Sequence, residues 1–455
     1  MKPVVTVAEM QAVDRAAADR VDVLVQRAGA AVAAEALRLL GGAYGRRVNV
    51  VVGKGNNGAD GRVAAARLVR RGARVVIVAA AGRDAPPPSL APSDLVIDAA
   101  FGTGFSGEYH APDPHGAPVL AVDIPSGVNG DTGVAADEAV RAVATVTFAA
   151  LKPGLVLGEG SARAGRVTVA DIGLDVATAR VHLVEDGDVG WLPTPRRDGH
   201  KWDRAVWVIA GSPGMRGAAR FCARGAQRAG AGMVRLGSPG VEASAQPATE
   251  AVARSLPSIG WDAEVLDDLN RFGAVVVGPG LGRDGAARDA VRRLVSASSV
   301  PIVVDADGLF ALGSADEAAP VITGAKSAVV LTPHDGEFAR LAGGPPGPDR
   351  LAAARGLAAR TGAVVLLKGS TTVVADPDGE ALLSASGDAR LATAGTGDVL
   401  SGVIGAFLAC GLPPLRAAGL GTYVHGRAAL LGPPWGLVAG DVAELLPAAI
   451  AEARR

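Results

Sequence analysis

Short runs of apolar residues alternate with segments of helical periodicity along most of this chain. The first clear run, Val48 to Val52, is followed by a glycine-rich loop and then by a helical pattern from Ala59 to Arg71. Apolar runs without alternation are typical of strands buried on both faces, as in parallel sheets covered by helices. Upstream, Thr6 and Glu9 have the spacing of a capping box, and a second helix is predicted over residues 21–40. The pattern therefore predicts an α/β fold.

This rhythm breaks at residues 192–198, whose sequence Leu-Pro-Thr-Pro-Arg-Arg-Asp is typical of a linker. We therefore expect two domains, 1–192 and 198–455, which is reasonable for 455 residues. An Asp-Gly pair at 378–379 predicts a hairpin between 371–375 and 380–383. The other predicted strands are residues 73–80, 95–99, 119–124 and 142–149 in the first domain, and 205–210, 233–236, 274–277, 301–305, 328–332 and 364–368 in the second.

Charge and cysteine content narrow the class of protein. The chain has 45 Lys and Arg against 46 Asp and Glu, which argues against a nucleic-acid-binding surface. It has 2 cysteines and no C-x-x-C motif, which argues against a zinc site. Acidic residues near the N-terminus and the absence of a long uncharged apolar run argue against a signal peptide and a membrane span. We expect a soluble, cytoplasmic protein that acts on small molecules, with no nucleic-acid or membrane partner.

Polar side chains follow three predicted strands of the first domain. Asn57 lies in the glycine-rich loop after the first strand, Asp98 ends the run at 95–99, and Ser126 follows the run at 119–124. Ligands of open α/β folds bind at the carboxyl edge of the sheet. An oxygen-only set suits a hard cation or ordered water, and Asp123 would lie nearby as a proton carrier. The loop alone would also fit an ordinary tight turn.

The motifs N-N-G-x-D-G, D-x-x-F-G-T-G and D-I-P-S-G occur here in order, and residues 1–190 resemble the NAD(P)H-hydrate epimerase family. The resemblance implies a Rossmann-like three-layer fold and a K⁺ ion bound by Asn57, Asp98 and Ser126. It also implies that Asp123 binds the substrate, and we choose Asp123 as the acid/base group. Ala59 stands where a glycine is common in the family. The other residues implied to line the hydrated nucleotide are Asn56, Asn57, Gly58, Ala59, Asp60, Gly102, Thr103, Gly104, Phe105, Ser106, Gly107 and Glu108.

Near the C-terminus, the sequence Ala-Gly-Thr-Gly-Asp of residues 394–398 precedes an apolar helical run. Glycines let the backbone approach an anion, and a helix N-terminus offers free N–H groups and a positive dipole end. Asp398 would lie where a substrate hydroxyl could be held beside a phosphate. The combination indicates phosphoryl transfer to an alcohol, with Asp398 as the base.

Further motifs occur in the order G-S-P-G-M-x-G-A-A, A-G-A-G, G-P-G-L-G, T-P-H-x-G-E and K-G-x-x-T before this element. Together they make residues 198–455 resemble the ribokinase-like superfamily, and within it the ADP-dependent NAD(P)H-hydrate dehydratases. The stretch at 200–205 departs from the family pattern, because Trp202 and Ala205 replace glycines. The residues implied to contact the hydrate are Ala231, Gly282, His334 and Asp398, and those implied to contact the adenine nucleotide are Lys368, Gly369, Ser370, Thr371, Thr372 and Gly397.

The two resemblances imply a bifunctional enzyme for the repair of hydrated NADH and NADPH. The first domain would interconvert the R and S hydrates. The second would phosphorylate the ring hydroxyl of the S form with ADP and Mg²⁺ and then eliminate phosphate, which leaves NAD(P)H, AMP and phosphate. The family tends to form homo-oligomers. Two alternatives stay open: a small-molecule kinase with an accessory N-terminal domain, and a non-catalytic nucleotide-binding protein.

Overall fold

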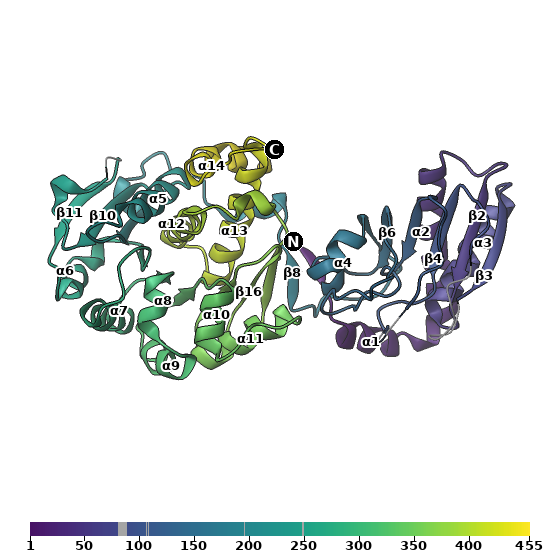
Figure 1. Ribbon diagram of the computed structural model, residues 1–455, viewed down its shortest axis with the longest axis horizontal. Coiled ribbons are helices and arrows are strands. Elements are labelled where there is room, and N and C mark those ends of the chain that lie inside the picture. The colour runs from purple at the N-terminus through teal and green to yellow at the C-terminus, as the bar shows by residue number, and fades with distance from the viewer. Residues whose placement is uncertain (81–88, 106, 108, 195, 248–249) are drawn as a thin grey trace. The chain divides into compact units, whose positions relative to one another are not determined.

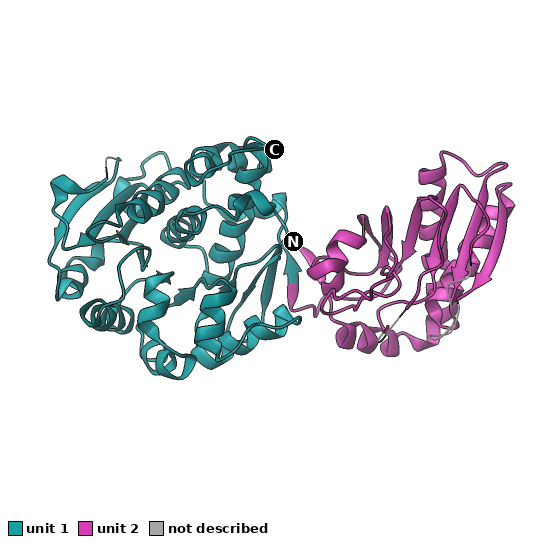
Figure 2. Cartoon of the chain, in the orientation of Figure 1, with its two compact units in different colours: residues 1, 182–455 teal, residues 2–181 magenta. Residues whose placement is uncertain are grey.

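The chain forms two compact units (Figure 2), which we call the N-terminal unit (residues 2–181) and the C-terminal unit (residues 182–455, with Met1). The computed structural model describes residues 1–80, 89–105, 107, 109–194, 196–247 and 250–455. The sequence placed the end of the first domain at 192, but residues 182–192 pack with the C-terminal unit. Val184, Val189 and Leu192 are buried in its core, and the amide of Val184 donates to the carbonyl of Leu383 at 3.0 Å.

The N-terminal unit is built on a parallel sheet in the order β3-β2-β4-β5-β6-β7 (Figure 1). The strands of this sheet are β2 (Arg47–Val52), β3 (Arg74–Ala79), β4 (Leu95–Ala99), β5 (Val119–Val122), β6 (Ala144–Phe148) and β7 (Arg166–Ala170); the short strand β1 (Lys2–Val4) is not part of it. The helices of the unit are α1 (Val7–Ala16), α2 (Val21–Leu40), α3 (Asn56–Arg70) and α4 (Gly158–Arg163).

Helices α2 and α3 cover one face of this sheet. Their small and aliphatic residues share a buried cluster with Val48, Val50 and Ile97 of the central strands. The predicted capping box of α1 is present, and α2 has the predicted bounds and ends at Gly41 in the left-handed conformation. Helix α3 begins at Asn56, three residues earlier than the pattern predicted. The asparagines are therefore in its first turn.

The C-terminal unit contains a larger sheet in the order β8-β17-β16-β15-β14-β13-β12-β9-β10-β11. Its strands are β8 (Val181–Leu183), β9 (Ala205–Ile209), β10 (Met233–Pro239), β11 (Val252–Leu256), β12 (Ala274–Val277), β13 (Ile302–Val304), β14 (Val329–Leu331), β15 (Val364–Leu367), β16 (Thr372–Ala375) and β17 (Ala381–Ser384). Its helices are α5 (Arg216–Arg228), α6 (Trp261–Asp267), α7 (Gly285–Ala297), α8 (Asp307–Leu312), α9 (Ala315–Thr323), α10 (Asp335–Ala342), α11 (Arg350–Thr361), α12 (Thr396–Ala409), α13 (Pro414–Leu431) and α14 (Ala439–Ala453).

Helices cover both faces of this sheet. Figure 1 shows α5, α12, α13 and α14 on one side and α7 to α11 on the other. The first group shares one buried cluster with Val206, Val276 and Leu366 of the strands. The predicted hairpin is present as the antiparallel pair β16–β17, with Ala375 opposite Ala381. The predicted α/β fold class with two domains of this kind is confirmed.

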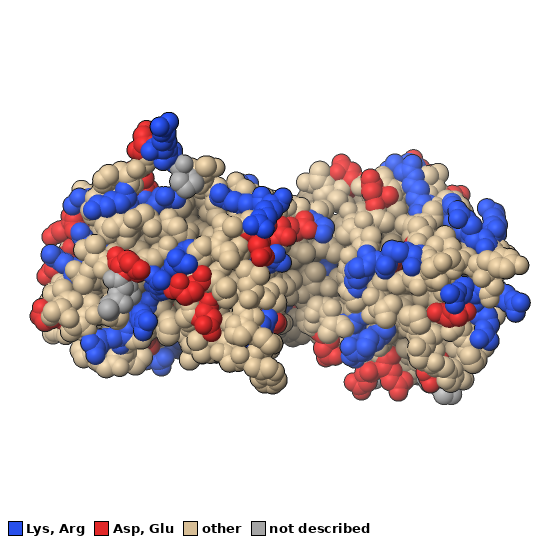
Figure 3. Space-filling model, turned by 90° about the horizontal axis from the view of Figure 1, so that it is seen from above, with Lys and Arg blue, Asp and Glu red and all other residues tan. Residues whose placement is uncertain are grey.

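Charged side chains of both signs are interspersed on each unit in the face drawn in Figure 3. Within the part of the chain that the structure describes, no helix is both long and apolar enough to cross a membrane.

Candidate functional sites

A cavity of about 1100 Å³ lies at the carboxyl ends of the parallel strands in the N-terminal unit. Its volume is slightly above the range usual for small-molecule sites, roughly 300–1000 Å³. Met10, Asp14, Arg15 and Lys152 are among the lining residues that the sequence did not predict. The lining residues that the sequence did predict are Asn56, Asn57, Asp60, Gly102, Thr103, Gly104 and Asp123.

Glycines shape the floor of this cavity because two loops approach each other closely. A Cβ atom on Gly53 would lie 2.0 Å from the carbonyl oxygen of Ala100, and one on Gly58 would lie 2.1 Å from that of Gly53. Neither position can hold a side chain without moving the backbone. Ala59, which departs from the family pattern, lies in the first turn of α3.

Some predicted residues lie elsewhere. The ring of Phe105 packs at 5.4 Å from that of Phe101 and at 6.3 Å from that of Tyr109. Phe105 and Gly107 line a separate hollow of about 490 Å³ instead of the large cavity. Ser106 and Glu108 lie outside the described residues.

The three predicted cation ligands are all oxygen donors, and two of them, Asp98 and Ser126, are hydrogen-bonded to each other. Asp98 is 2% exposed, and it accepts hydrogen bonds from the amide of Ser126 at 2.8 Å and from its hydroxyl at 2.7 Å. Burial, opposed by these bonds, raises the pKa of Asp98 to about 6. Both side-chain polar atoms of Asn57 are buried without a partner among the described residues. A buried amide without partners needs a ligand, so the group fits a monovalent cation or ordered water.

The carboxyl groups of Asp14, Asp60 and Asp123 line the large cavity, together with the ammonium groups of Lys54 and Lys152. Lys152 donates to Asp123 at 2.7 Å. Burial, and then the charges of Asp123 and Asp14, raises the pKa of Asp60 to about 8. Burial and the charge of Asp123 also raise the pKa of Asp14, against the opposing effect of Lys152. The cavity therefore holds the protonated carboxyl of Asp60 at neutral pH near the ion pair of Asp123 and Lys152, which is an arrangement suited to proton transfer.

In the C-terminal unit, the start of α12 forms the second site. Gly395 caps this helix with φ +91°, so that Thr396, Gly397 and Asp398 occupy its first turn. The unpaired N–H groups of this turn can bind an anion. A Cβ on Gly397 would lie 3.5 Å from Nζ of Lys368, which places the lysine over the same turn.

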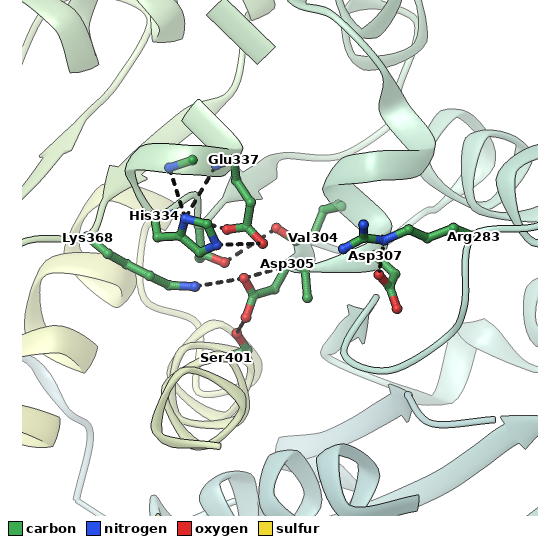
Figure 4. Close-up of polar contacts among 11 residues, drawn as sticks. Arg283, Val304, Asp305, Asp307, His334, Glu337, Lys368 and Ser401 are labelled. Atoms are coloured by element: carbon green, nitrogen blue, oxygen red, sulfur yellow. Dashed lines mark hydrogen bonds and ion pairs between the residues drawn. The ribbon is translucent and has the colours of Figure 1, made fainter. Parts of the chain in front are cut away.

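Asp305 fixes this lysine (Figure 4). Nζ of Lys368 donates to one oxygen of Asp305 at 2.8 Å, and the hydroxyl of Ser401 donates to the other at 2.6 Å. Burial works to raise the pKa of Asp305, but Lys368 and the hydrogen bonds outweigh it and hold the pKa below its usual value. Burial, then the charge of Asp305, raises the pKa of Asp398 to about 7 against the opposing charge of Lys368. Such a carboxylate can act as a base near neutral pH.

Of the predicted hydrate-binding residues, Gly282 and His334 lie on loops at the carboxyl edge of this sheet. Ala231 lies at the amino edge, where the amide of the next residue, Gly232, donates to the carbonyl of Arg204 just before β9. His334 caps α10: its Nδ1 accepts from the amides of Gly336 at 3.0 Å and Glu337 at 3.3 Å (Figure 4). In its neutral form the ring therefore carries its proton on Nε2. The amide of Gly282 donates to Asp307 at 3.0 Å. Ala231 lies in the turn between α5 and β10 and is half-buried.

Five of the six predicted nucleotide-binding residues follow β15, and the sixth, Gly397, lies in the first turn of α12. The amide of Lys368 donates to the carbonyl of Pro333 at 3.0 Å, so this loop is bonded to the loop that carries His334. Arg350 braces it, with one nitrogen 2.6 Å from the carbonyl of Lys368. Gly369 and Ser370 are exposed, whereas Thr371 and Thr372 are buried at the start of β16.

The two departures at 202 and 205 have structural explanations. The ring of Trp202 packs 5.5 Å from that of Phe272, and the guanidinium of Arg271 lies 3.9 Å from the centre of the Trp202 ring. Ala205 is the first residue of β9 and is fully buried. Both residues therefore pack at the edge of the core.

Sequence reasoning missed Lys152 and Asp305. A signal was present for Asp305, which ends a predicted strand as Asp98 does. Lys152 follows the strand that ends at Phe148 by only a few residues. Backbone strain marks both neighbourhoods: Asp123 has φ +66° and Ala306 has φ +51°. Such conformations in residues other than glycine often occur at functional sites.

Comparison with known families gives one match for each unit. The model of the family described as NAD(P)H-hydrate dehydratase matches residues 206–439. The model described as YjeF-related protein N-terminus matches residues 21–91 and 83–154.

Relatives match along nearly the whole chain. A protein named bifunctional NAD(P)H-hydrate repair enzyme Nnr from Mycobacterium leprae is 40% identical over 439 residues, which are 90% of this chain and 89% of that protein. The protein of the same name from Moorella thermoacetica is 37% identical over 97% of this chain and 96% of its own length. Among solved structures, the ADP/ATP-dependent NAD(P)H-hydrate dehydratase from Bacillus subtilis, co-crystallised with ATP and Mg²⁺, is 30% identical with a TM-score of 0.52. The match covers 59% of this chain and 97% of that one.

Proposed function

This chain belongs to the family of bifunctional NAD(P)H-hydrate repair enzymes, and we propose that each unit carries one of the two activities. The N-terminal unit interconverts the R and S hydrates of NADH and NADPH. The C-terminal unit dehydrates the S form at the expense of ADP. The observation that carries the second assignment is the placement of Lys368, Asp305 and Asp398 around the first turn of α12.

In the C-terminal unit, Asp398 accepts the proton of the ring hydroxyl as that oxygen takes the terminal phosphate of ADP. The amides of the first turn of α12 and the ammonium of Lys368 stabilise the charge on the transferred group. Phosphate then leaves with the electrons of the C–O bond, and loss of a ring proton restores the dihydronicotinamide. The reaction gives AMP and phosphate. Phosphate is a far better leaving group than hydroxide, so phosphorylation is what makes the elimination fast.

Magnesium is expected to reach this site with the nucleotide. Among the described residues, no group of three or more His, Cys, Asp or Glu side chains is arranged to hold a metal ion. Mg²⁺ commonly binds through substrate phosphates and one or two carboxylates and retains several waters. The ion would offset charge on the phosphates, near the pair formed by Lys368 and Asp305.

In the N-terminal unit, Asp123 exchanges protons with the hydrated carbon's hydroxyl while that centre opens and closes. The remaining predicted residues around the cavity hold the nucleotide. Asn57, Asp98 and Ser126 would hold K⁺, which supplies fixed positive charge beside the substrate. The unpartnered buried amide of Asn57 supports this assignment.

The proposal can be tested with an equal mixture of the two epimers of the hydrate. The full-length protein is incubated with equal amounts of R and S hydrate, ADP, Mg²⁺ and K⁺, and the restored cofactor is followed by its absorbance. We expect conversion of the whole pool, at a rate above that of spontaneous epimer exchange, with AMP and inorganic phosphate as products. Rapid conversion of only half the pool would show that the chain has no epimerase activity. A stable phosphomonoester in the ³¹P NMR spectrum would instead indicate a small-molecule kinase, and absence of turnover a non-catalytic nucleotide-binding protein.

A further inference from the structure

Lys152 is a fully buried lysine at the wall of the N-terminal cavity. Its side chain is 1% exposed, which is rare for lysine unless the charge is paired. Its ammonium donates to Oδ1 of Asp123 at 2.7 Å, to Oγ1 of Thr147 at 2.9 Å and to the carbonyl of Phe148 at 3.0 Å. An ammonium has three donors. All three are used within the protein, so Lys152 has none left for a substrate.

The two oxygens of Asp123 have different surroundings. Oδ1 accepts from Lys152 and, at 3.0 Å, from the hydroxyl of Thr147. Oδ2 receives no hydrogen bond from the described residues. It faces Gly102, where an added Cβ would lie 3.4 Å away, and both residues line the cavity. The carboxylate is thus held on one side and open on the other.

The backbone of Asp123 is also held in a defined conformation. Asp123 has φ +66°, a left-handed conformation that is strained for a residue with a side chain. Its amide donates to the carbonyl of Val146 at 2.7 Å, which ties it to strand β6. Thr147 lies on the same strand and Lys152 shortly after it. One segment, residues 146–152, therefore holds both the backbone and Oδ1 of Asp123.

We propose that Lys152 is a positioning residue which, with Thr147, fixes Oδ1 of Asp123 so that Oδ2 is the oxygen that exchanges protons with the hydrate. This inference rests on the proposed epimerase activity of the N-terminal unit. Oδ2 takes the hydroxyl proton, the O–H electron pair forms the carbonyl, and the C–N pair returns to the ring nitrogen. The same carboxyl then delivers that proton to the nitrogen. Reclosure on the other face of the carbonyl reverses these steps and gives the second epimer, with no net change in protons.

The experiment uses the full-length chain with R hydrate and an excess of an Asp123→Asn chain to dehydrate each S epimer as it forms. Lys152→Met removes the charge and keeps an unbranched apolar side chain. We expect kcat for epimerisation to fall roughly tenfold to a thousandfold with KM within about twofold. Thr147→Val keeps the lysine and tests the same contact more mildly, with an expected loss of about threefold to tenfold.

The matched control is Thr145→Val on the same strand. Thr145 is also fully buried, and its hydroxyl donates to the carbonyl of Ala164 at 2.6 Å, away from Asp123. Its kcat is expected to stay within about twofold of the parent. The decisive comparison is the double variant Lys152→Met with Asp123→Asn. If Lys152 acts only through Asp123, the double variant should have the same kcat as Asp123→Asn alone. If the two residues act independently, the fold losses in kcat of the single variants should multiply.

An unchanged kcat in Lys152→Met, or multiplying losses in the double variant, would overturn the inference. If Thr145→Val lost as much as Thr147→Val, the effect would be one of general strand packing, which also overturns it. If Asp123→Asn itself kept the parent rate, the proposed acid/base role would fail together with the inference. If Asp123→Asn were inactive and Lys152→Met fully active, the positioning role of Lys152 would be wrong while the acid/base role of Asp123 would stand.

Discussion

The ammonium of Lys368 lies 2.8 Å from the carboxylate of Asp305, whose side chain is 3% exposed. Asp305 thereby fixes a long flexible side chain over the first turn of α12, and Ser401 of that helix fixes Asp305 in turn. Strand β13, strand β15 and helix α12 are joined through this one buried carboxylate. Its charge also raises the pKa of Asp398, the base we propose for the dehydration.

Asp305→Asn should therefore impair dehydration while leaving epimerisation unchanged. The amide cannot pair with Lys368 as a carboxylate does, so we expect kcat of dehydration to fall roughly tenfold to a hundredfold. Steady-state kinetics with S hydrate and ADP measure this. Asp262→Asn is the matched control: Asp262 is also buried and paired, with Arg293 at 2.7 Å, but contacts none of the proposed site residues. A loss of kcat in that variant as large as in Asp305→Asn would contradict a specific role for Asp305.

The pH dependence of dehydration should follow Asp398. A protonated carboxyl cannot accept the hydroxyl proton, and the pKa of Asp398 is raised to about 7. We expect kcat/KM for S hydrate to fall about tenfold per pH unit below that value and to level off above it. Because the charge of Asp305 raises the pKa of Asp398, Asp305→Asn should shift the fall in kcat/KM to lower pH. A rate that is constant between pH 5 and 8 would exclude Asp398 as the base.

Asp60 should make the N-terminal unit less stable as the pH rises. Its pKa is about 8 in the folded protein against the ordinary value of 3.8 for an aspartate, so the unfolded chain releases the proton at lower pH. The free energy of unfolding therefore falls between about pH 4 and pH 8. Asp60→Asn cannot ionise and should have a higher Tm than the parent at pH 8, with no such gain at pH 4. The exposed Asp137→Asn serves as control, and an equal gain there would contradict the explanation.

Helix α12 depends on a close crossing with α5. A Cβ on Gly402 would lie 2.0 Å from the carbonyl oxygen of Cys222, so Gly402→Ala must push the two helices apart. We expect a loss of about 1–3 kcal/mol in the free energy of unfolding. Gly356 in α11 is also helical but has no neighbour within 4 Å of an added Cβ. Gly356→Ala should stabilise by roughly 0.5–1 kcal/mol. Urea unfolding measures both, and equal effects would argue against the crossing as the cause.

Much of the fold could be predicted from the sequence because its strands are continuous apolar runs. The apolar runs that begin at Leu95 and Ala274 predicted strands β4 and β12 with the correct bounds. Gly41 correctly predicted the end of α2. Strand β7 was missed, because Arg166–Ala170 carries a charged and a hydroxyl side chain and is only partly buried. The boundary between the units was placed too late, since the prolines of residues 192–198 are a stronger local signal than the short strand β8.

The predicted sites depended on sequence motifs. Motifs identify the loops that carry site residues, but they do not identify the distant residues that bind and hold those side chains. They pointed to Asp123 and Lys368, but the residues that hold these side chains come from other strands. Lys152 and Asp305 are single residues with no pattern around them, and only the folded chain places them at 2.7 and 2.8 Å from their partners. Phe105 illustrates the opposite case, since it directly follows a matching motif but packs in a separate aromatic cluster.

The central claim is that one chain carries two separate activities, one dependent on Asp123 and the other on Asp398. Asp123→Asn and Asp398→Asn chains are tested alone and mixed, with racemic hydrate, ADP, Mg²⁺ and K⁺, after correction for spontaneous epimer exchange. We predict rapid conversion of half the pool by Asp123→Asn, no conversion by Asp398→Asn, and conversion of the whole pool by the mixture. Rapid conversion of the whole pool by either variant alone would contradict the claim.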